Sequence, residues 1–188
     1  PASFHSVVEE NGRLMEIQGR WTPSAWMVTT TADRKSRTNE LDLARIDLST
    51  ADHAFVGEGS SDAAGHSVAS AGDVDEDGLD DILVGAPYND DGGDQAGKAY
   101  LILGGSLSGV GSLDLDSADS IFAGEEEDQW TGRSVAAAGD VDGDGLADIL
   151  VGAPFDNDAL DPGSAHLFLG LSLDAGGSFV VSEADYIL

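Results

Sequence analysis

Residues 65–88 read GHSVASAGDVDEDGLDDILVGAPY, and residues 132–155 read GRSVAAAGDVDGDGLADILVGAPF. The two stretches align without a gap, and the similarity continues on both sides of them. Upstream, Phe55-Val56-Gly57-Glu58 aligns with Phe122-Ala123-Gly124-Glu125. Downstream, after a deletion of one residue, residues 97–104 align with residues 163–170. Self-similarity at a fixed spacing is the signature of a repeat protein, so we expect two full copies of one unit over roughly residues 48–181.

Each copy has the pattern of short β-strands. Residues 67–71 alternate polar and small apolar side chains, 81–87 form an apolar run that ends at a proline, and 99–103 form another that glycines close. Such runs, bounded by Gly, Pro, Asn and Asp, favour strands over helices. A fourth strand is expected near 52–56 or 119–123. About four strands per copy suit a propeller blade better than a solenoid rung, so the sequence predicts an all-β fold of β-propeller-type blades. One blade cannot bury both of its faces alone.

The charge of the chain excludes several classes of partner. The 188 residues carry 36 acidic and 8 basic side chains, for a formal net charge of −28. Such a surface repels phosphates, which argues against nucleic acid and against anionic membrane surfaces. No apolar run approaches the roughly eighteen residues of a membrane span, so no membrane insertion is expected. The chain has no Cys, which excludes disulfides, thiolate metal sites and cysteine nucleophiles.

The charge is distributed unevenly, and this predicts a module boundary. Residues 1–47 hold six of the eight basic side chains and seven acids, whereas residues 48–188 hold two basic side chains and 29 acids. We expect a non-repeat N-terminal β segment at 1–47, a first repeat at 48–114, a second at 115–181 and the start of a third unit at 182–188. Within the first segment, we expect a hairpin in which residues 14–17 pair with residues 25–31 around a turn at 21–24. A polar loop at 32–39 and an apolar stretch at 41–48 follow. Because Pro1 stands where an initiator Met would be, the chain is expected to be processed or cut from a longer one.

Each repeat contains a nine-residue acidic loop. The first loop, 73–81, has carboxylates at its positions 1, 3, 5 and 9 and glycine at position 6, and the second loop, 140–148, repeats this arrangement. These carboxylates repel one another unless a cation lies among them. Calcium accepts six to eight hard oxygen ligands in irregular geometry, whereas magnesium prefers an octahedral shell with several waters. An EF-hand requires an acid at position 12, which is Val84 or Val151 here. The alternative is an acidic surface turn without a metal, because Asp and Gly favour turns.

The stretches GDVDEDGLDDILVGAP and GDVDGDGLADILVGAP resemble the FG-GAP repeat of integrin α-subunit propellers and related extracellular proteins. The resemblance implies a seven-bladed β-propeller in which the acidic loop joins two strands of a blade and binds Ca²⁺. The family's Phe-Gly pair has Ala64 in place of phenylalanine in one copy and Thr131 in the other. Two repeats cannot close a seven-bladed ring, so the chain would be part of a longer propeller, or 1–47 or other chains would cover the open blade edges. Two Ca²⁺ sites are implied, with these ligands: Asp73, Asp75, Asp77, Leu79 (carbonyl) and Asp81; and Asp140, Asp142, Asp144, Leu146 (carbonyl) and Asp148.

The expected function is that of an extracellular or cell-surface module for adhesion or protein recognition, with structural Ca²⁺ and an unspecified protein ligand. No grouping of nucleophile, base and oxyanion donor stands out from the repeat, so no catalytic residue and no enzymatic activity are expected. Two alternatives remain: a non-catalytic accessory module of a secreted hydrolase, and an architectural subunit that self-associates through open blade edges. Two bound Ca²⁺ ions would leave most of the negative charge in place, and we hypothesise that the excess suits a saline habitat.

Overall fold

The computed structural model describes residues 3–10, 13–22, 25–30, 48–109, 111–155, 162–173 and 176–188. The chain divides into two compact units, Pro1–Asp52 and His53–Leu188, which are described separately. In the first unit, β1 (Ser3–Glu10), β2 (Arg13–Thr22) and β3 (Ala25–Thr30) form an antiparallel sheet in that order. The β2–β3 hairpin agrees with the expected one, although β2 is longer, and the sequence pattern gave no indication of β1. The short helix η1 (Leu48–Thr50) follows, while the loop predicted at 32–39 and nearly all of the stretch 41–48 lie outside the described residues.

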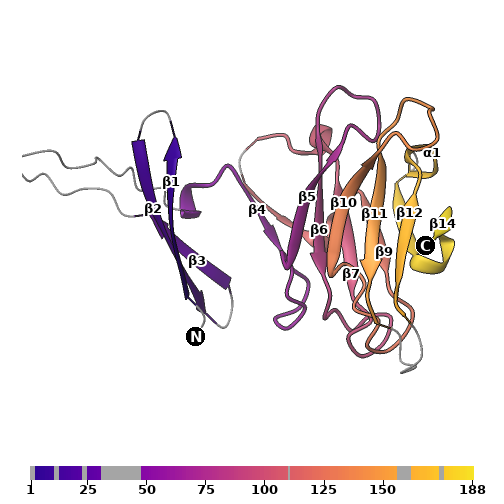
Figure 1. Cartoon of the computed structure of the whole chain (residues 1–188), viewed down its shortest axis with the longest axis horizontal. Coiled ribbons are helices and arrows are strands. Elements are labelled where there is room, and N and C mark those ends of the chain that lie inside the picture. Colours follow the sequence, from indigo (N-terminus) through magenta and orange to yellow (C-terminus); the bar gives the residue numbers. More distant parts are fainter. Residues whose placement is uncertain are drawn as a thin grey trace, which may run out of the picture. The chain divides into compact units, whose positions relative to one another are not determined.

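The second unit is built almost wholly of strands, as Figure 1 shows. Its helical elements are the single turns η2 (Gly104–Ser106), η3 (Leu115–Ser117), α1 (Gly170–Leu173) and η4 (Val181–Glu183). The prediction of an all-β fold is therefore confirmed. No helix in the described part of the chain is long and apolar enough to cross a membrane. The strands are β4 (His53–Val56), β5 (Ser67–Gly72), β6 (Asp81–Ala86), β7 (Lys98–Ile102), β8 (Gly111–Asp114), β9 (Ser120–Ala123), β10 (Ser134–Gly139), β11 (Asp148–Ala153), β12 (Ser164–Phe168), β13 (Gly177–Val180) and β14 (Tyr186–Ile187).

The strands of the second unit form two four-stranded antiparallel blades. The first blade consists of β5, β6, β7 and β9, and the second of β10, β11, β12 and β14. Of the two stretches expected to supply a fourth strand, 119–123 supplies that of the first blade, and β14 within 182–188 completes the second blade in the same way. In addition, β13 lies parallel beside β9, and β8 lies parallel beside β4. The repeat boundaries at 48, 115 and 182 stay a prediction, because strand pairing crosses them.

The two blades pack face to face through one hydrophobic core. Side chains alternate along each strand, so Leu83, Leu101 and Phe122 of the first blade point toward the second blade, where Val151 and Phe168 meet them. The ring centroids of Phe122 and Phe168 are 4.6 Å apart. The opposite face of the first blade forms a second core. It contains Val84, Tyr100, Ile102 and, from η3, Leu115. Because both faces are covered, the middle strands read as apolar runs rather than as strict alternation.

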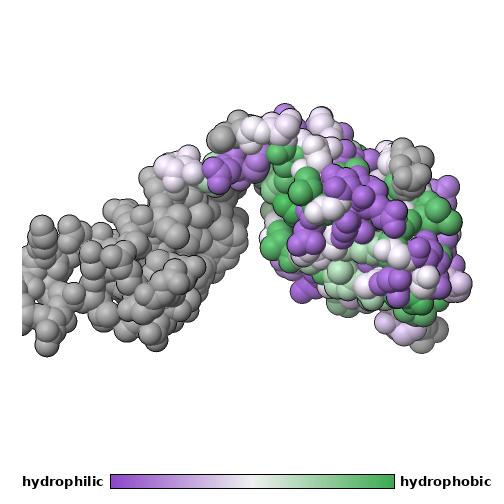
Figure 2. Space-filling view, turned by 90° about the horizontal axis from the view of Figure 1, so that it is seen from above, coloured by the Kyte–Doolittle hydropathy of each residue, from purple (hydrophilic) through white to green (hydrophobic). Residues whose placement is uncertain are grey.

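The exposed surface of the described repeat region mixes polar and apolar side chains, as Figure 2 shows. Val68 on β5 is 66% exposed and Leu188 at the end of the chain is 74% exposed. Val68 faces the same side of the first blade as Val84, whereas its counterpart Val135 in the second blade packs into the core between the blades. The same residue type is therefore covered in one repeat and open in the other.

The blades approach most closely at glycines. Ser67 Oγ donates a hydrogen bond of 2.8 Å to the carbonyl of Gly132. A Cβ atom added to Gly85, in the VGAP stretch of the first repeat, would lie 1.9 Å from that same carbonyl oxygen. Gly132 itself has φ of +79°, in the left-handed region that favours glycine. Side chains larger than hydrogen at Gly85 are thus excluded by the neighbouring backbone.

We predict that Gly85→Ala lowers the free energy of unfolding by about 2–3 kcal/mol, because the new methyl group forces the blades apart. Gly152→Ala is the matched control at the same position of the second repeat. There the nearest atom to an added Cβ is the side-chain Oγ of Ser134, at 2.3 Å, which moves by rotation about one bond. The control is expected to cost less than about 1 kcal/mol. Urea unfolding of both variants measures the difference, and equal effects would show that close blade packing does not distinguish these glycines.

Candidate metal centre

The two acidic loops connect neighbouring strands at the same end of the two blades (Figure 1). The first loop joins β5 to β6, and the second joins β10 to β11. Glycine at position 6 has a positive φ in both, +87° at Gly78 and +103° at Gly145, which allows the chain to turn back. The backbone N–H of Ala147 in the second loop donates to the carbonyl of Asp73 in the first, at 3.1 Å. Packing of the blades therefore places the two loops side by side.

The aspartate at position 9 is the fixed point of each loop. Asp81 is fully buried, and its two carboxylate oxygens accept hydrogen bonds from the backbone N–H groups of Val74, at 2.7 Å, and Gly104, at 2.8 Å. Asp148 is equally buried and accepts from Val141 and Gly170. One carboxylate thus ties the start of its loop to the turn that follows the third strand of the blade.

The turn glycines Gly104 and Gly170 were not expected to take part in this site. Both glycines occur at matching positions of the two repeats, and this recurrence could have indicated their role. A second pair of aspartates repeats in the same way. Asp119 accepts hydrogen bonds from Leu103 N–H and Ser106 Oγ, and Asp185 accepts from Leu169 N–H and Ser172 Oγ. These aspartates brace the turn on which the position-9 carboxylate relies.

Three carboxylates converge in each loop. Oxygen atoms of Asp73, Asp75 and Asp81 lie within 4.8 Å of one another, and the same holds for Asp140, Asp142 and Asp148. In the first loop, Asp73 Oδ2 accepts from Gly78 N–H, but Asp73 Oδ1 is buried and has no hydrogen-bond partner in the described part of the chain. A buried carboxylate oxygen without a donor costs free energy unless a cation contacts it. The residues present therefore fit a hard divalent cation.

The electrostatics of the first loop are consistent with this fit. Burial raises the pKa of Asp81, the hydrogen bonds from Gly104 and Val74 oppose that shift, and the carboxylates of Asp75 and Asp73 raise the pKa further. A cation bound among these carboxylates would replace their mutual repulsion with attraction to the metal. A calcium ion would supply charge neutralisation and a common anchor for the loop, and the side chains would hold it through hard oxygen atoms.

The remaining expected ligands are arranged differently. Asp77 and Asp144 are exposed and stand outside the two groups of three. Their Oδ1 atoms accept hydrogen bonds from the backbone N–H groups of Leu79 and Leu146, at 2.7 and 2.8 Å. These bonds shape the second half of each loop. Metal ligation by Asp77, Asp144 and the carbonyls of Leu79 and Leu146 stays a prediction, as does ligation by the six converging aspartates.

Comparison with known proteins matches the repeats to a family. The model of the FG-GAP repeat matches residues 64–102 and 131–168. The chain carries two FG-GAP repeats. Such repeats are the blades of β-propellers, so the two four-stranded sheets that they form here are propeller-type blades.

Curated proteins similar to this chain include integrin α-subunits. Integrin alpha-6 of Gallus gallus is 39% identical over 109 residues, which is 56% of this chain and 9% of that protein. Integrin alpha-7 of Homo sapiens is 40% identical over 121 residues, or 62% of this chain and 9% of that protein. Integrin alpha-6 of Homo sapiens is 34% identical over 134 residues, or 67% and 11%. The chain thus spans about a tenth of the length of these relatives.

We predict that, when no metal is present, the aspartate at position 9 of the loop stabilises the fold and the aspartate at position 3 does not. In the presence of a chelator, Asp81→Ala should lower the free energy of unfolding by about 2–3 kcal/mol, because it leaves the buried N–H of Val74 and the partly buried N–H of Gly104 without an acceptor. Asp75→Ala should cost less than about 0.5 kcal/mol, since it removes a repelling charge and no buried hydrogen bond. Urea unfolding with and without chelator measures both, and equal losses would refute the distinct structural role of Asp81.

Proposed function

We propose that this chain is a Ca²⁺-binding, non-catalytic propeller-blade module that serves protein recognition or adhesion outside the cell. The observation that supports it most is the convergence of three carboxylates in each loop, where the buried oxygen Asp73 Oδ1 has no donor among the described residues. The similarity to integrin α-subunits supports the recognition role and the extracellular or cell-surface location. The ligands proposed for the two ions are those expected from the sequence.

The metal has a structural role in this proposal. Each ion neutralises carboxylates that otherwise repel one another and holds a loop that contacts the neighbouring blade, as the bond from Ala147 N–H to the Asp73 carbonyl illustrates. Binding to the folded state alone stabilises that state, by about 2.7 kcal/mol when free Ca²⁺ is a hundred times the dissociation constant. Sites of this kind in extracellular modules are half-saturated at roughly 0.1–1 mM Ca²⁺. The millimolar calcium concentration outside cells is therefore high enough to fill such sites, so the stability of the fold should depend on calcium.

We predict two Ca²⁺ sites by isothermal titration calorimetry, and a rise in melting temperature with Ca²⁺ that exceeds the rise with Mg²⁺. Asp75→Ala should remove the first site and Asp142→Ala the second, and the double variant should melt at the same temperature with Ca²⁺ or chelator. Asp80→Ala is the matched control, because it removes one negative charge from the first loop at a position where the second loop has Ala147. Retention of both sites in the double variant, or their loss in the control, would contradict the assignment.

A specific observation also favours self-association. Among the described residues, β4 pairs with β8 alone, whereas its counterpart β9 pairs with β13 on one edge and β7 on the other. The second edge of β4 thus offers unpaired backbone groups to a strand from elsewhere. We propose this edge as the contact through which another propeller unit adds to the chain, in an assembly or in a longer propeller.

Sedimentation velocity over a range of protein concentrations tests association through β4. Ala54→Pro removes a backbone N–H from this strand and should shift the chain toward the monomer. The control Ala123→Pro, at the end of the matching strand β9, should instead destabilise the first blade and lower its melting temperature. A wild-type chain that stays monomeric at all concentrations would argue against self-association.

A further inference from the structure

The two blades differ at two polar positions of their third strands, β7 and β12. In the first blade, Lys98 Nζ contacts both carboxylate oxygens of Glu58 at 3.0 Å and also the carboxylate of Asp91. Tyr100 Oη donates to Glu58 Oε1 at 2.8 Å. The side chain of Lys98 is only 9% exposed. Burial alone would lower the pKa of Lys98, but its bonds to Asp91 and Glu58 raise it, so the ammonium group stays charged.

The strand register identifies the matching residues of the second blade. Lys98 lies opposite Ala86 and Tyr100 opposite Val84 in the first blade. In the second, Ser164 lies opposite Ala153 and His166 opposite Val151, which are the matching partners in the repeat. The counterpart of Glu58 is Glu125, in the aligned Phe-x-Gly-Glu stretch. The carboxylate is therefore retained, while serine and histidine replace the lysine and the tyrosine.

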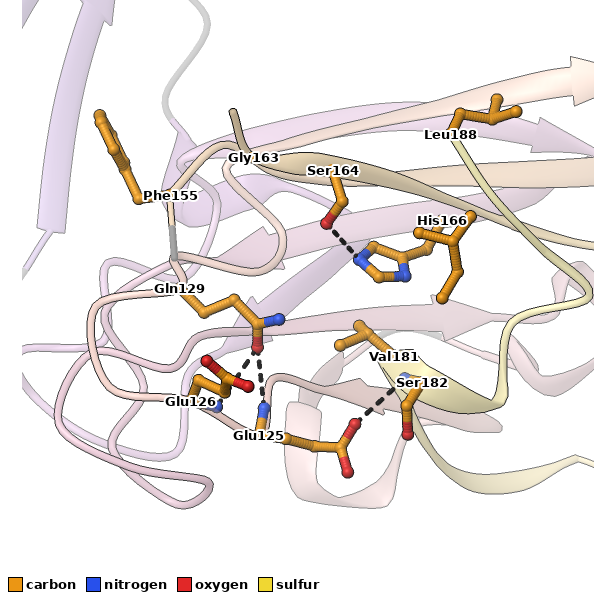
Figure 3. A pocket seen from close by; sticks show the side chains of 11 residues that line it. Glu125, Glu126, Gln129, Phe155, Gly163, Ser164, His166, Val181, Ser182 and Leu188 are labelled. Atoms are coloured by element: carbon orange, nitrogen blue, oxygen red, sulfur yellow. Dashed lines mark hydrogen bonds between the residues drawn. The ribbon is translucent and has the colours of Figure 1, made fainter. Parts of the chain in front are cut away.

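A cavity of about 380 Å³ lies beside Ser164 and His166, between the second blade and the segment 125–129 that precedes it, and its volume is within the range typical of ligand pockets. Figure 3 shows Glu125 at one side of the cavity and the ring of His166 at its inner wall. Val181, Ile187 and Leu188 contribute apolar surface, and Phe155 lies at the other end. Phe155 is held against Trp130, with ring centroids 4.6 Å apart.

The polar groups of the cavity are incompletely paired. His166 is 3% exposed and bonds to Ser164 Oγ through Nε2 at 2.8 Å, while its Nδ1 is buried and makes no hydrogen bond of ordinary geometry with the described residues. Burial lowers the pKa of His166, whereas the Val181 backbone, a hydrogen-bond acceptor facing the ring, and the negative charge of Glu125 oppose this shift. Glu125 is exposed at the mouth of the cavity, and its Oε2 accepts one hydrogen bond, from Ser182 N–H at 3.1 Å. In the described region, no lysine or arginine forms an ion pair with Glu125.

We propose that this cavity binds the side chain of a lysine on a partner protein, with its ammonium group against Glu125 in the place that Lys98 fills in the first blade. The carboxylate of Glu125 supplies the negative charge and the hydrogen-bond acceptors for the ammonium group, as Glu58 does for Lys98. The apolar walls cover the aliphatic stem of the lysine. The strongly negative charge of the chain speeds the approach of a basic partner.

This inference deepens the proposed recognition function by naming the chemistry of the partner, and it does not depend on the identity of the metal. The test is an NMR titration of the whole ¹⁵N-labelled chain at saturating Ca²⁺ with Nα-acetyl-lysine methylamide. Shifts are expected at Glu125, Ser164, His166 and Ser182. The norleucine analogue lacks the charge and glycinamide lacks the stem, so both should bind at least about tenfold more weakly. Equal binding by either compound, or no shifts at these residues, overturns the proposal.

Two variants locate the site. Glu125→Gln should weaken lysine binding about tenfold, because it removes the charge that the ammonium group contacts. Ser164→Lys with His166→Tyr rebuilds the arrangement of the first blade, and should abolish binding while the spectrum of the rest of the fold stays unchanged. The control Glu58→Gln removes the carboxylate that holds Lys98, and should lower the melting temperature but leave lysine binding intact.

The outcomes separate this site from the calcium proposal. If the double variant Asp75→Ala with Asp142→Ala loses Ca²⁺ binding but still binds lysine, the result supports the cavity as the lysine site. It also shows that lysine binding does not require the metal. Calcium binding without lysine binding would overturn the cavity and leave the metal sites standing. Undiminished lysine binding in Glu125→Gln would place the ligand elsewhere and overturn the assignment.

Discussion

The buried carboxylate at position 9 of each loop is the interaction on which the rest of the repeat depends. Asp81 and Asp148 each accept two backbone hydrogen bonds, one from the start of the loop and one from the turn after the third strand. A buried carboxylate is costly unless such donors surround it, and both donors are fixed by the blade itself. Loop, strand and turn therefore fold as one unit. The same carboxylates face two further acids, so the geometry that satisfies the backbone also creates the need for a cation.

The arrangement explains why each blade is incomplete by itself. Position-9 aspartates order the loops, but the loops and the apolar faces of the strands are covered only when a second blade packs against the first, as at Ser67 and Gly132. The contact requires backbones to approach at Gly85, which is why the VGAP stretch contains a glycine in the middle of a strand. Stability in such repeats resides largely in the interfaces between units.

Divergence between the repeats is as informative as their similarity. Where the first blade holds Lys98 and Tyr100 against Glu58, the second holds Ser164 and His166 near Glu125. The positions of Lys98 and Tyr100 lie within the two matched repeats, yet they carry different residues in the two copies. In the first blade they complete an internal ion pair, and in the second they line a polar cavity. Function in repeat proteins can therefore lie in the positions where copies differ.

Much of the fold could be read from the sequence, because the repeat doubled every local signal. The strands at 67–71, 81–87 and 99–103, the turn glycines and the converging aspartates at positions 1, 3 and 9 all follow from short-range patterns that occur twice. The exposed side chains of Asp77 and Asp144 were not separable from the other loop acids by spacing alone. Gly85 and Gly152 have the same neighbours in sequence, yet within the described part of the chain only Gly85 meets the backbone of another blade. Tertiary structure alone decided three other features, because each depends on segments that are distant in the chain. These features are the pairing of β9 with β7, the burial of Asp73 Oδ1 and the cavity beside His166.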